Sequence, residues 1–449
     1  MTDSIMSTDR KILKKTLIIL SYFVIWQVLS LIADSWLFPG PVETIKAAGV
    51  MLSEKRFYIS VLASLARILL GLLASLAAAA AAACLAYKCR AVGEYISPLV
   101  HFASSVPVAC LAVIVIILFS GNALAFFVVL FIVFPVAYTQ LFSLLDSVDI
   151  KMLEMAKVYD FTLGMRARCI FLPHIREGFK KTIELCIGMC FKAGIAAEVI
   201  GMVRNSIGGE LYKTKLYFET DRLFAWIFFI MIVSFAALRL ISLLYTAITG
   251  TLMKCPAAGK KATDTSADIA LKNVSMSFKD QKVIDSLDLN VSNPGIYFVF
   301  GPPGRGKTTL LGIIAGIIKP TGGTASKVSC SYAFQETRLI SHLSVSDNLK
   351  LAGIEKGDLD LPAGFADEEY LNKKTGSLSG GEKRKAELLR ALFSGRKYIL
   401  LDEPFTWLDV EGKKEVSGII RKKAKDAAVI ISIHEEGSAP CLTGITLFK

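Results

Sequence analysis

The sequence predicts a multidomain protein in which an all-α polytopic membrane domain of six helices precedes an α/β domain. The chain of 449 residues has a mean hydropathy of +0.52, too high for an ordinary soluble enzyme. The apolar excess lies almost wholly before residue 250, whereas strand-like and helical segments alternate beyond residue 269. We therefore expect domains at 1–253 and 269–449, joined by a linker at 254–268 that is rich in turn formers and small polar residues.

Six apolar runs of membrane-spanning length justify the membrane domain. They cover approximately residues 16–33, 61–87, 96–118, 122–144, 181–202 and 223–249. The first run starts as a signal peptide would, but its length and the interruption by Trp26 and Gln27 favour an uncleaved helix. The loop from Leu145 to Lys181 is rich in Lys and Arg, so the positive-inside rule places it in the cytoplasm with both termini. We expect a multi-pass protein of the inner (cytoplasmic) membrane, in contact with lipid.

Charge and cysteine content exclude other classes. The formal net charge is +12, but the basic residues lie mostly beside apolar segments, where they set membrane topology, so nucleic acid is not an expected partner. The nine cysteines form no CxxC pair and the four histidines are isolated. Neither a zinc site nor a disulfide framework is therefore expected.

The α/β domain is organised around a glycine-rich loop at 301–309, GPPGRGKTT, which lies between an apolar strand-like run and a helical pattern. This is the context of a phosphate-binding P-loop. Its backbone N–H groups and the following helix end attract phosphate, a lysine reaches the β- and γ-phosphates, and a threonine hydroxyl binds Mg²⁺. ATP and Mg²⁺ are the expected cofactors. The expected nucleotide-binding residues are Gly301, Gly304, Gly306, Lys307, Thr308 and Thr309, with Thr308 also a metal ligand.

A second strand-like run, 397–401, ends in the carboxylates Asp402 and Glu403. Such a strand end alone is as often a structural cap as a functional site. Together with the glycine-rich loop, it fits a Walker B pattern. We expect Asp402 to hold Mg²⁺ through water and Glu403 to polarise the attacking water as the general base.

The segment 378–382, LSGGE, precedes a helical pattern and resembles the signature motif of ABC ATPases. A serine hydroxyl and glycine amides at a helix start provide a second phosphate-binding surface. The resemblance implies that Ser379, Gly380 and Gly381 complete the ATP site of an opposing subunit. The family usually has Gln where this chain has Glu382.

Further positions match the same family in order along the chain. The resemblance places Gln335 in the Q-loop, where it senses Mg²⁺ and the permease, and His434 as the switch histidine that contacts the γ-phosphate. It places Phe278 against adenine and puts Trp407 in the D-loop, where a small residue is usual. Glu403, His434 and Gln335 are thus the expected catalytic residues, and Gln335 is also an expected metal ligand. A lone His or Phe would ordinarily be core, so these roles depend on the ordered set.

The loop around residues 154–164 resembles the cytoplasmic "EAA" loop of permease subunits from binding-protein-dependent ABC importers, in particular the nitrate/sulfonate/taurine type. The segments 105–109, 197–201 and 207–209 fit the same resemblance. In that family the loop forms a short coupling helix that docks on the ATPase. Met155 and Asp160 stand where the family usually has Ala and Gly.

The resemblance implies ATP-driven import of a small solute by a fused permease–ATPase half-transporter. It further implies a homodimer that works with an extracytoplasmic solute-binding protein. Two alternatives are an ATP-driven exporter and a membrane-tethered regulatory ATPase that moves no solute.

Lys192 lies near the middle of the fifth apolar run, where a lysine costs roughly 2.5–3.5 kcal/mol on insertion scales. No acidic residue stands three or four positions away on the same helix. Two interpretations follow. Lys192 either belongs to a structural pair with another span or to a buried polar network, or it lines the translocation path and favours an anionic or polar solute.

Overall fold

The computed structural model describes residues 2–32, 37–119, 121–253, 268–278, 281–359, 367–433, 442 and 444–448. Its contacts divide the chain into two compact units. The helical unit combines Met1–Ser147 with His174–Thr251, and the cassette unit combines Val148–Pro173 with Leu252–Lys449. The loop 148–173 therefore packs with the C-terminal part of the chain, although it lies within the sequence of the helical unit.

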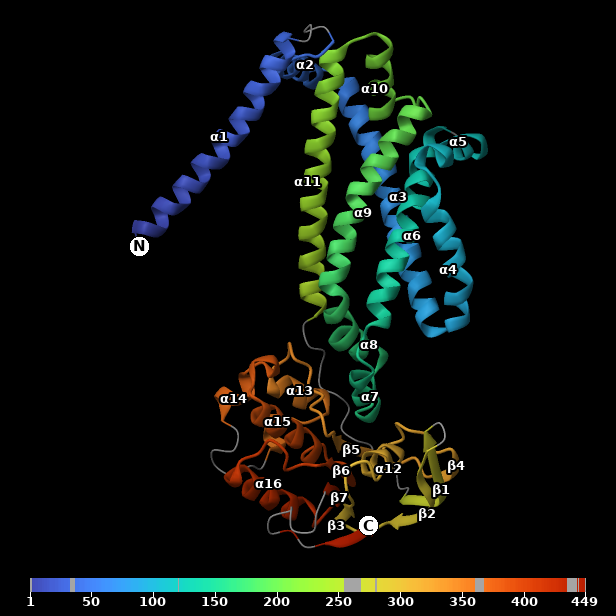
Figure 1. Cartoon of the computed structure of the whole chain (residues 1–449), viewed down its shortest axis with the longest axis vertical. Coiled ribbons are helices and arrows are strands. Elements are labelled where there is room, and N and C mark those ends of the chain that lie inside the picture. The colour runs from blue at the N-terminus through green and yellow to red at the C-terminus, as the bar shows by residue number, and fades with distance from the viewer. Residues whose placement is uncertain are drawn as a thin grey trace. The chain divides into compact units, whose positions relative to one another are not determined.

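The helical unit contains nine α-helices among its described residues, several of them long (Figure 1). They are α1 (Thr2–Ile32), α2 (Pro41–Leu52), α3 (Lys55–Lys88), α4 (Arg90–Ser105), α5 (Val108–Leu118), α6 (Leu124–Asp146), α9 (Leu172–Ile200), α10 (Ile207–Leu216) and α11 (Thr220–Leu252). Helices α3 and α6 pack closely at Gly71, where a Cβ atom would lie 2.8 Å from the carbonyl oxygen of Phe126. A small residue at this position lets the two helices pack backbone to backbone.

Three helices of the described residues are long and apolar enough to cross a membrane, namely α3, the stretch Gly121–Asp146 and α11. Helices α4 and α5 meet the criterion only together and are bent by 104° at a break, so the count rises to four if they form one span. The predicted apolar run 96–118 is therefore divided between two helices, and it counts as one span only if α4 and α5 cross the membrane together. Pro107 lacks an N–H group and disfavours helical backbone at Val106, whose ψ is 124°.

The other two predicted runs are helical but weaker. The apolar part of α1, Thr16–Ile32, is shorter than a full span. Helix α9 covers the run 181–202 almost completely, yet Glu184, Lys192 and Glu198 lie within it. By length and composition alone, the described residues thus identify three or four of the six predicted spans.

The cassette unit contains two sheets. The larger has the strand order β5-β6-β7-β3-β8 with parallel pairing, and the smaller is an antiparallel sheet of order β2-β1-β4. The strands are β1 (Ile269–Phe278), β2 (Gln281–Val291), β3 (Gly295–Phe300), β4 (Gly322–Ala325), β5 (Cys330–Ala333), β6 (Tyr398–Asp402), β7 (Ala428–Ile433) and β8 (Ile445–Phe448). Parallel pairing brings the carboxyl ends of β3, β6 and β7 to one edge, where ligands bind in open α/β sheets.

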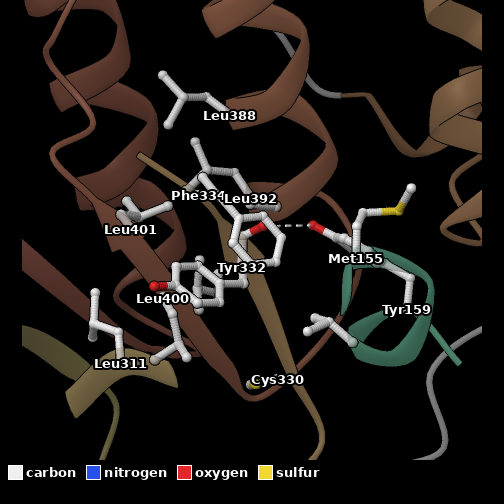
Figure 2. Close-up of a cluster of buried hydrophobic side chains, with 14 of the residues drawn as sticks. Met155, Tyr159, Leu311, Cys330, Tyr332, Phe334, Leu388, Leu392, Leu400 and Leu401 are labelled. Atoms are coloured by element: carbon white, nitrogen blue, oxygen red, sulfur yellow. Dashed lines mark hydrogen bonds between the residues drawn. The ribbon is translucent and has the colours of Figure 1, made fainter. Parts of the chain in front are cut away.

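Helices cover this sheet and include part of the loop 148–173. They are α7 (Ile150–Val158), α8 (Leu163–Arg166), α12 (Lys307–Ile314), α13 (Val345–Leu351), α14 (Glu368–Asn372), α15 (Gly380–Leu392) and α16 (Val410–Lys423). One buried hydrophobic cluster joins α7 to the sheet and to α15. Figure 2 shows Met155 and Tyr159 from this loop beside Tyr332 and Leu392 of the cassette. The loop is therefore part of the hydrophobic core of the cassette unit.

Candidate functional site

The glycine-rich loop connects β3, which ends at Phe300, to α12, which begins at Lys307. Gly306 precedes the helix with a φ of 92°, a left-handed conformation that favours glycine. A Cβ atom at Gly306 would also lie 2.6 Å from Cγ1 of Val283, so a side chain cannot fit there. Thr308 is exposed in the first turn of α12. The loop therefore has the strand–turn–helix form that a phosphate group requires.

Lys307 is buried, with 5% of its surface exposed. Its Nζ donates hydrogen bonds to the carbonyl oxygens of Gly301 at 2.6 Å and Pro302 at 3.2 Å. The ammonium group is thus directed back over the loop, among oxygen acceptors. Phosphate oxygens offer the same acceptor chemistry with more negative charge, so the position of Lys307 fits a bound phosphate.

Asp402 ends β6 with a fully buried carboxylate. It accepts a hydrogen bond from Ser432 Oγ at 2.5 Å and one from the Tyr332 hydroxyl at 3.3 Å. No group of three or more His, Cys, Asp or Glu side chains that could hold a metal occurs within the described residues. A single carboxylate beside a phosphate-binding loop suits Mg²⁺, which keeps several waters and takes few protein ligands besides the phosphates.

Glu403 follows with a φ of 48°, in the left-handed region that a non-glycine residue rarely adopts. Its backbone N–H donates to Ser432 Oγ at 3.0 Å and to the Ser432 carbonyl at 3.3 Å. This conformation ends the strand abruptly and leaves the side chain half-buried. Strained backbone of this kind occurs at active sites, where the surrounding structure holds it in place.

Arg384 in α15 holds the backbone that carries Asp402 and Glu403, and the sequence analysis did not identify it. Its guanidinium is fully buried and donates to the carbonyl oxygens of Asp402 at 2.6 Å, Glu403 at 2.9 Å and Pro404 at 3.4 Å. It also donates to the carbonyl of Phe334, directly before Gln335. One side chain therefore connects the end of β6 to the segment that contains Gln335.

The charge of Arg384 is balanced by Glu387, which is also fully buried. Glu387 lies 3.5 Å from Arg384 and 3.5 Å from Arg390, and it accepts the backbone N–H of Arg338. Burial raises the pKa of Glu387 and lowers the pKa of Arg384. Arg384, Glu387 and Arg390 are spaced three residues apart, so they share one face of the helix. This spacing was the signal in the sequence from which the charge cluster could have been predicted.

Gln335 lies after β5 and is exposed. Nearby, Arg338 donates to Glu154 Oε2 at 2.7 Å, and Glu336 forms an ion pair with Lys151. The segment that contains Gln335 thus contacts α7. The family resemblance implied a contact between the loop 148–173 and the ATPase, and this contact is present within the cassette unit.

The backbone conformation and the contacts of Asp160 explain why this residue can replace the glycine that the family usually has. Its φ is 53°, so the backbone is left-handed there, as glycine would favour. Its carboxylate pairs at 3.1 Å with Arg396, which is buried and also donates to the carbonyls of Val158 at 2.8 Å and Cys330 at 2.9 Å. The neighbouring Tyr159 is buried, which raises the pKa of its hydroxyl, and that hydroxyl donates to the carbonyl of Tyr332 at 3.2 Å.

We expect Asp160→Gly to change the free energy of unfolding of the cassette unit by less than about 1 kcal/mol, because the Asp160 carboxylate is largely exposed and the buried Arg396 keeps its carbonyl partners. Asp160→Val should cost roughly 1–2 kcal/mol more, because a β-branched residue resists left-handed backbone. Chemical denaturation of the purified protein checks both values. Equal destabilisation by the two variants would contradict this account of Asp160.

The signature segment begins α15. Ser379 Oγ accepts the backbone N–H of Glu382 at 3.3 Å, and Glu382 Oε2 accepts the backbone N–H of Ser379 at 2.8 Å. This capping box accepts Glu as readily as Gln, which accounts for Glu382. The hydrogen bond from the backbone of Ser379 lowers the pKa of Glu382. Ser379 and Gly380 are exposed and Gly381 is half-buried, so the motif is accessible to another molecule.

For the remaining predicted residues, the structure gives positions but no contact with the glycine-rich loop or the Asp402–Glu403 pair. Phe278 ends β1 and is 49% exposed. Trp407 is 73% exposed, and its carbonyl lies 3.0 Å from where a Cβ atom of Gly381 would be. His434 lies outside the described residues, directly after β7. The structure therefore groups the glycine-rich loop with Asp402 and Glu403 at one sheet edge, while the signature segment stands on a separate helix.

Comparison with known proteins agrees with this geometry. The family model described as "ABC transporter" matches residues 284–406. The chain is 35% identical over 201 residues to an aliphatic sulfonates import ATP-binding protein of Agrobacterium fabrum, a match that covers 42% of this chain and 70% of that protein. It is 30% identical over 204 residues to an ergothioneine transport ATP-binding protein of Helicobacter pylori, covering 40% of this chain and 95% of that protein.

A solved dimeric bacterial ABC transporter cassette shares 23% identity, covering 38% of this chain and 90% of that chain, with a TM-score of 0.34. The range that the family model matches includes the glycine-rich loop, the signature segment and the Asp402–Glu403 pair. The chain therefore belongs to the ABC transporter family, and its C-terminal part is an ATP-hydrolysing ABC cassette.

Proposed function

We propose that the chain is a fused half-transporter that imports a solute at the expense of ATP. The proposal is supported mainly by the burial of the loop 148–173 in the cassette unit. This loop lies between the long helices α6 and α9 in the sequence, and its apolar face is buried in the core of the cassette unit. Met155 and Ala156 are fully buried there. A loop held in this way connects nucleotide-driven changes in the cassette to the helices on either side of it.

The proposed roles in ATP hydrolysis follow from the geometry. Backbone N–H groups of the loop 301–306 and the Lys307 ammonium bind the phosphates, while Thr308, Gln335 and Asp402 would hold Mg²⁺. The metal, when bound, neutralises charge on the phosphate oxygens. Glu403 accepts a proton from the attacking water. We keep His434 as the residue that contacts the γ-phosphate and Phe278 as the adenine contact, both from the family resemblance.

Two copies of the chain would form the working transporter. Ser379 and Gly380 are exposed and would contact the nucleotide that a second cassette binds. A symmetric dimer would therefore contain two ATP sites, each formed by the glycine-rich loop of one copy and the signature segment of the other. We further propose the domain division 1–253, 254–268 and 269–449, and six spans with both termini in the cytoplasm. Import with a solute-binding protein, of the nitrate/sulfonate/taurine type, is supported by the EAA-like loop and by the importers among the relatives.

Reconstitution into proteoliposomes tests the function. Uptake of a solute that requires ATP and a separate binding protein is the expected result. ATP-driven movement in the opposite direction without a binding protein would identify an exporter. ATP hydrolysis without movement of any solute tested would identify a regulatory ATPase.

The contact between α7 and the cassette gives a sharper prediction. We expect Glu154→Arg to uncouple transport from ATP hydrolysis, because it would place a second cation beside Arg338. Transport should fall at least tenfold while nucleotide binding is unchanged. The double variant Glu154→Arg/Arg338→Glu should recover part of the loss, with a coupling energy of roughly 0.5–3 kcal/mol.

Lys151→Ala is the matched control, because its pair with Glu336 lies at the same contact but is exposed on both sides. Its effect on transport should be small. If the double variant transported no better than Glu154→Arg alone, direct pairing across this contact would not carry the coupling.

A further inference from the structure

Strand β7 carries a buried hydroxyl group at the sheet edge where the candidate site lies. In the larger sheet β7 lies between β6 and β3 (Figure 1). Its residue Ser432 stands in register with Asp402 on one side and with Val299 on the other. Ser432 is fully buried, so its hydroxyl has no access to bulk solvent. It therefore lies between the strand that carries the carboxylates and the strand that leads into the glycine-rich loop.

The Ser432 hydroxyl joins the two carboxylate residues. Its Oγ accepts the backbone N–H of Glu403 at 3.0 Å and lies 2.5 Å from Oδ1 of Asp402. An ionised carboxylate can only accept a hydrogen bond, so the single hydroxyl proton is donated to Asp402. A chain of hydrogen bonds thus runs from the Glu403 N–H through the hydroxyl to the Asp402 carboxylate. The bonds of such a chain polarise one another, and a bond to a charged acceptor is a strong one.

This chain holds a backbone conformation that glutamate does not favour by itself. Glu403 has a φ of 48°, and left-handed backbone at a non-glycine residue persists only where the surrounding structure fixes it. Arg384 holds the turn from the carbonyl side of Asp402 and Glu403. Ser432 holds it from the N–H side, and its bond to Oδ1 also fixes the direction of the Asp402 carboxylate.

We propose that Ser432 is a positioning residue for ATP hydrolysis, which sets the Glu403 side chain at the distance and direction from Asp402 that activation of water requires. Ser432 acts through these two residues. A misplacement of about 1 Å at a reacting group can cost roughly 10²-fold in rate, so removal of the hydroxyl should appear in kcat. The inference rests on the proposed role of Glu403 as the general base, whereas the hydrogen-bond chain is present without nucleotide.

Threonine and valine form a matched pair at position 432, because they have the same shape but only threonine keeps a hydroxyl. In the purified full-length protein we expect Ser432→Val to lower kcat at least tenfold, with less than a twofold change in the Kd for ATP. Ser432→Thr should retain at least half of the parent kcat. Ser432→Ala, which adds no bulk to the buried strand, should repeat the valine result.

Ser331→Ala is the control for loss of a buried hydroxyl. Ser331 is also fully buried in the larger sheet, but its hydroxyl donates to the carbonyl of Ala391 at 2.7 Å. Its kcat should stay within twofold of the parent value. A parent kcat in Ser432→Ala, equal rates in the threonine and valine variants, or an equal loss in Ser331→Ala would each overturn the proposal.

Amide hydrogen exchange without nucleotide tests the chain independently of activity. The Glu403 amide should exchange at least tenfold faster in Ser432→Val than in Ser432→Thr, as measured by mass spectrometry with fragmentation. The same amide should be unaffected in Ser331→Ala. Equal exchange in the valine and threonine variants would show that the hydroxyl does not hold this backbone.

A double variant tests whether Ser432 acts through Glu403. In Glu403→Gln, adding Ser432→Val should lower the residual rate of hydrolysis less than twofold, because residues that act as a unit are not additive. A further loss as large as that of Ser432→Val alone would overturn the proposal. If Glu403→Gln hydrolysed ATP at the parent rate, the role of Glu403 as the base would fail, whereas the exchange result would still report on the hydrogen-bond chain.

Discussion

Glu403→Gln should lower the rate of ATP hydrolysis by roughly 10²–10⁴-fold, the range that a general base contributes, while ATP remains bound. Glutamine preserves the size of the side chain and its position after β6, but it cannot accept the proton from water. The loss should fall on kcat, because the interaction exists only as the water attacks. Steady-state phosphate release and retention of labelled ATP on the purified protein check the two parts of this prediction.

Lys307→Ala is the contrasting variant. Lys307 holds phosphate before and during the reaction, so its removal should raise the Kd for ATP as well as slow turnover. The Glu403→Gln protein should also accumulate as a closed dimer in ATP, whereas Lys307→Ala should not. Hydrolysis by Glu403→Gln at the parent rate would show that another group activates the water.

Arg384→Met should destabilise the cassette by about 3–5 kcal/mol, the usual cost of removing one partner from a buried ion pair. The Tm of its unfolding transition should fall by roughly 6–20 °C for a domain of this size. Four carbonyl oxygens lose a donor, and the buried Glu387 carboxylate keeps only Arg390 as a cation. Scanning calorimetry of the full-length protein measures the shift.

The double variant Arg384→Met/Glu387→Leu should recover part of that stability, because it no longer buries an underpaired carboxylate. Lys385→Met is the control, since Lys385 is adjacent to Arg384 and its pair with Glu415 at 3.7 Å is half-exposed, so its effect should stay near 0.5 kcal/mol. A double variant no more stable than Arg384→Met would show that the lost carbonyl contacts, not the unbalanced charge, dominate.

Local motifs made the cassette predictable. The loop 301–309 and the pair Asp402–Glu403 each carry their chemistry within a few consecutive residues. Parallel pairing of β3, β6 and β7 then brings the strand ends to one edge without further information. Glu382 shows the same locality, because a capping box depends only on residues three apart.

Features that depend on tertiary packing were not predictable. Hydropathy shows that the run 96–118 is apolar, and Pro107 marks where its helical backbone breaks, but the angle of 104° between α4 and α5 depends on tertiary packing. The role of Arg384 depends on carbonyl groups from β6 and from the segment after β5, which only folding brings together. The environment of Lys192 likewise depends on folding, because the acidic side chains within the run 181–202 bond to side chains of other helices.

The buried loop 148–173 also constrains how the chain is made. Tyr159 and its hydrogen-bond partner Tyr332 are separated by 173 positions, so a ribosome needs on the order of 10–30 seconds to synthesise the second after the first. During that interval the apolar face formed by Met155, Ala156 and Tyr159 has no cassette to cover it. A cassette expressed from residue 268 onward would carry the complementary bare surface and should tend to aggregate. The two halves therefore depend on each other during biogenesis, and adding the segment 148–173 as a peptide should improve the solubility of the isolated cassette.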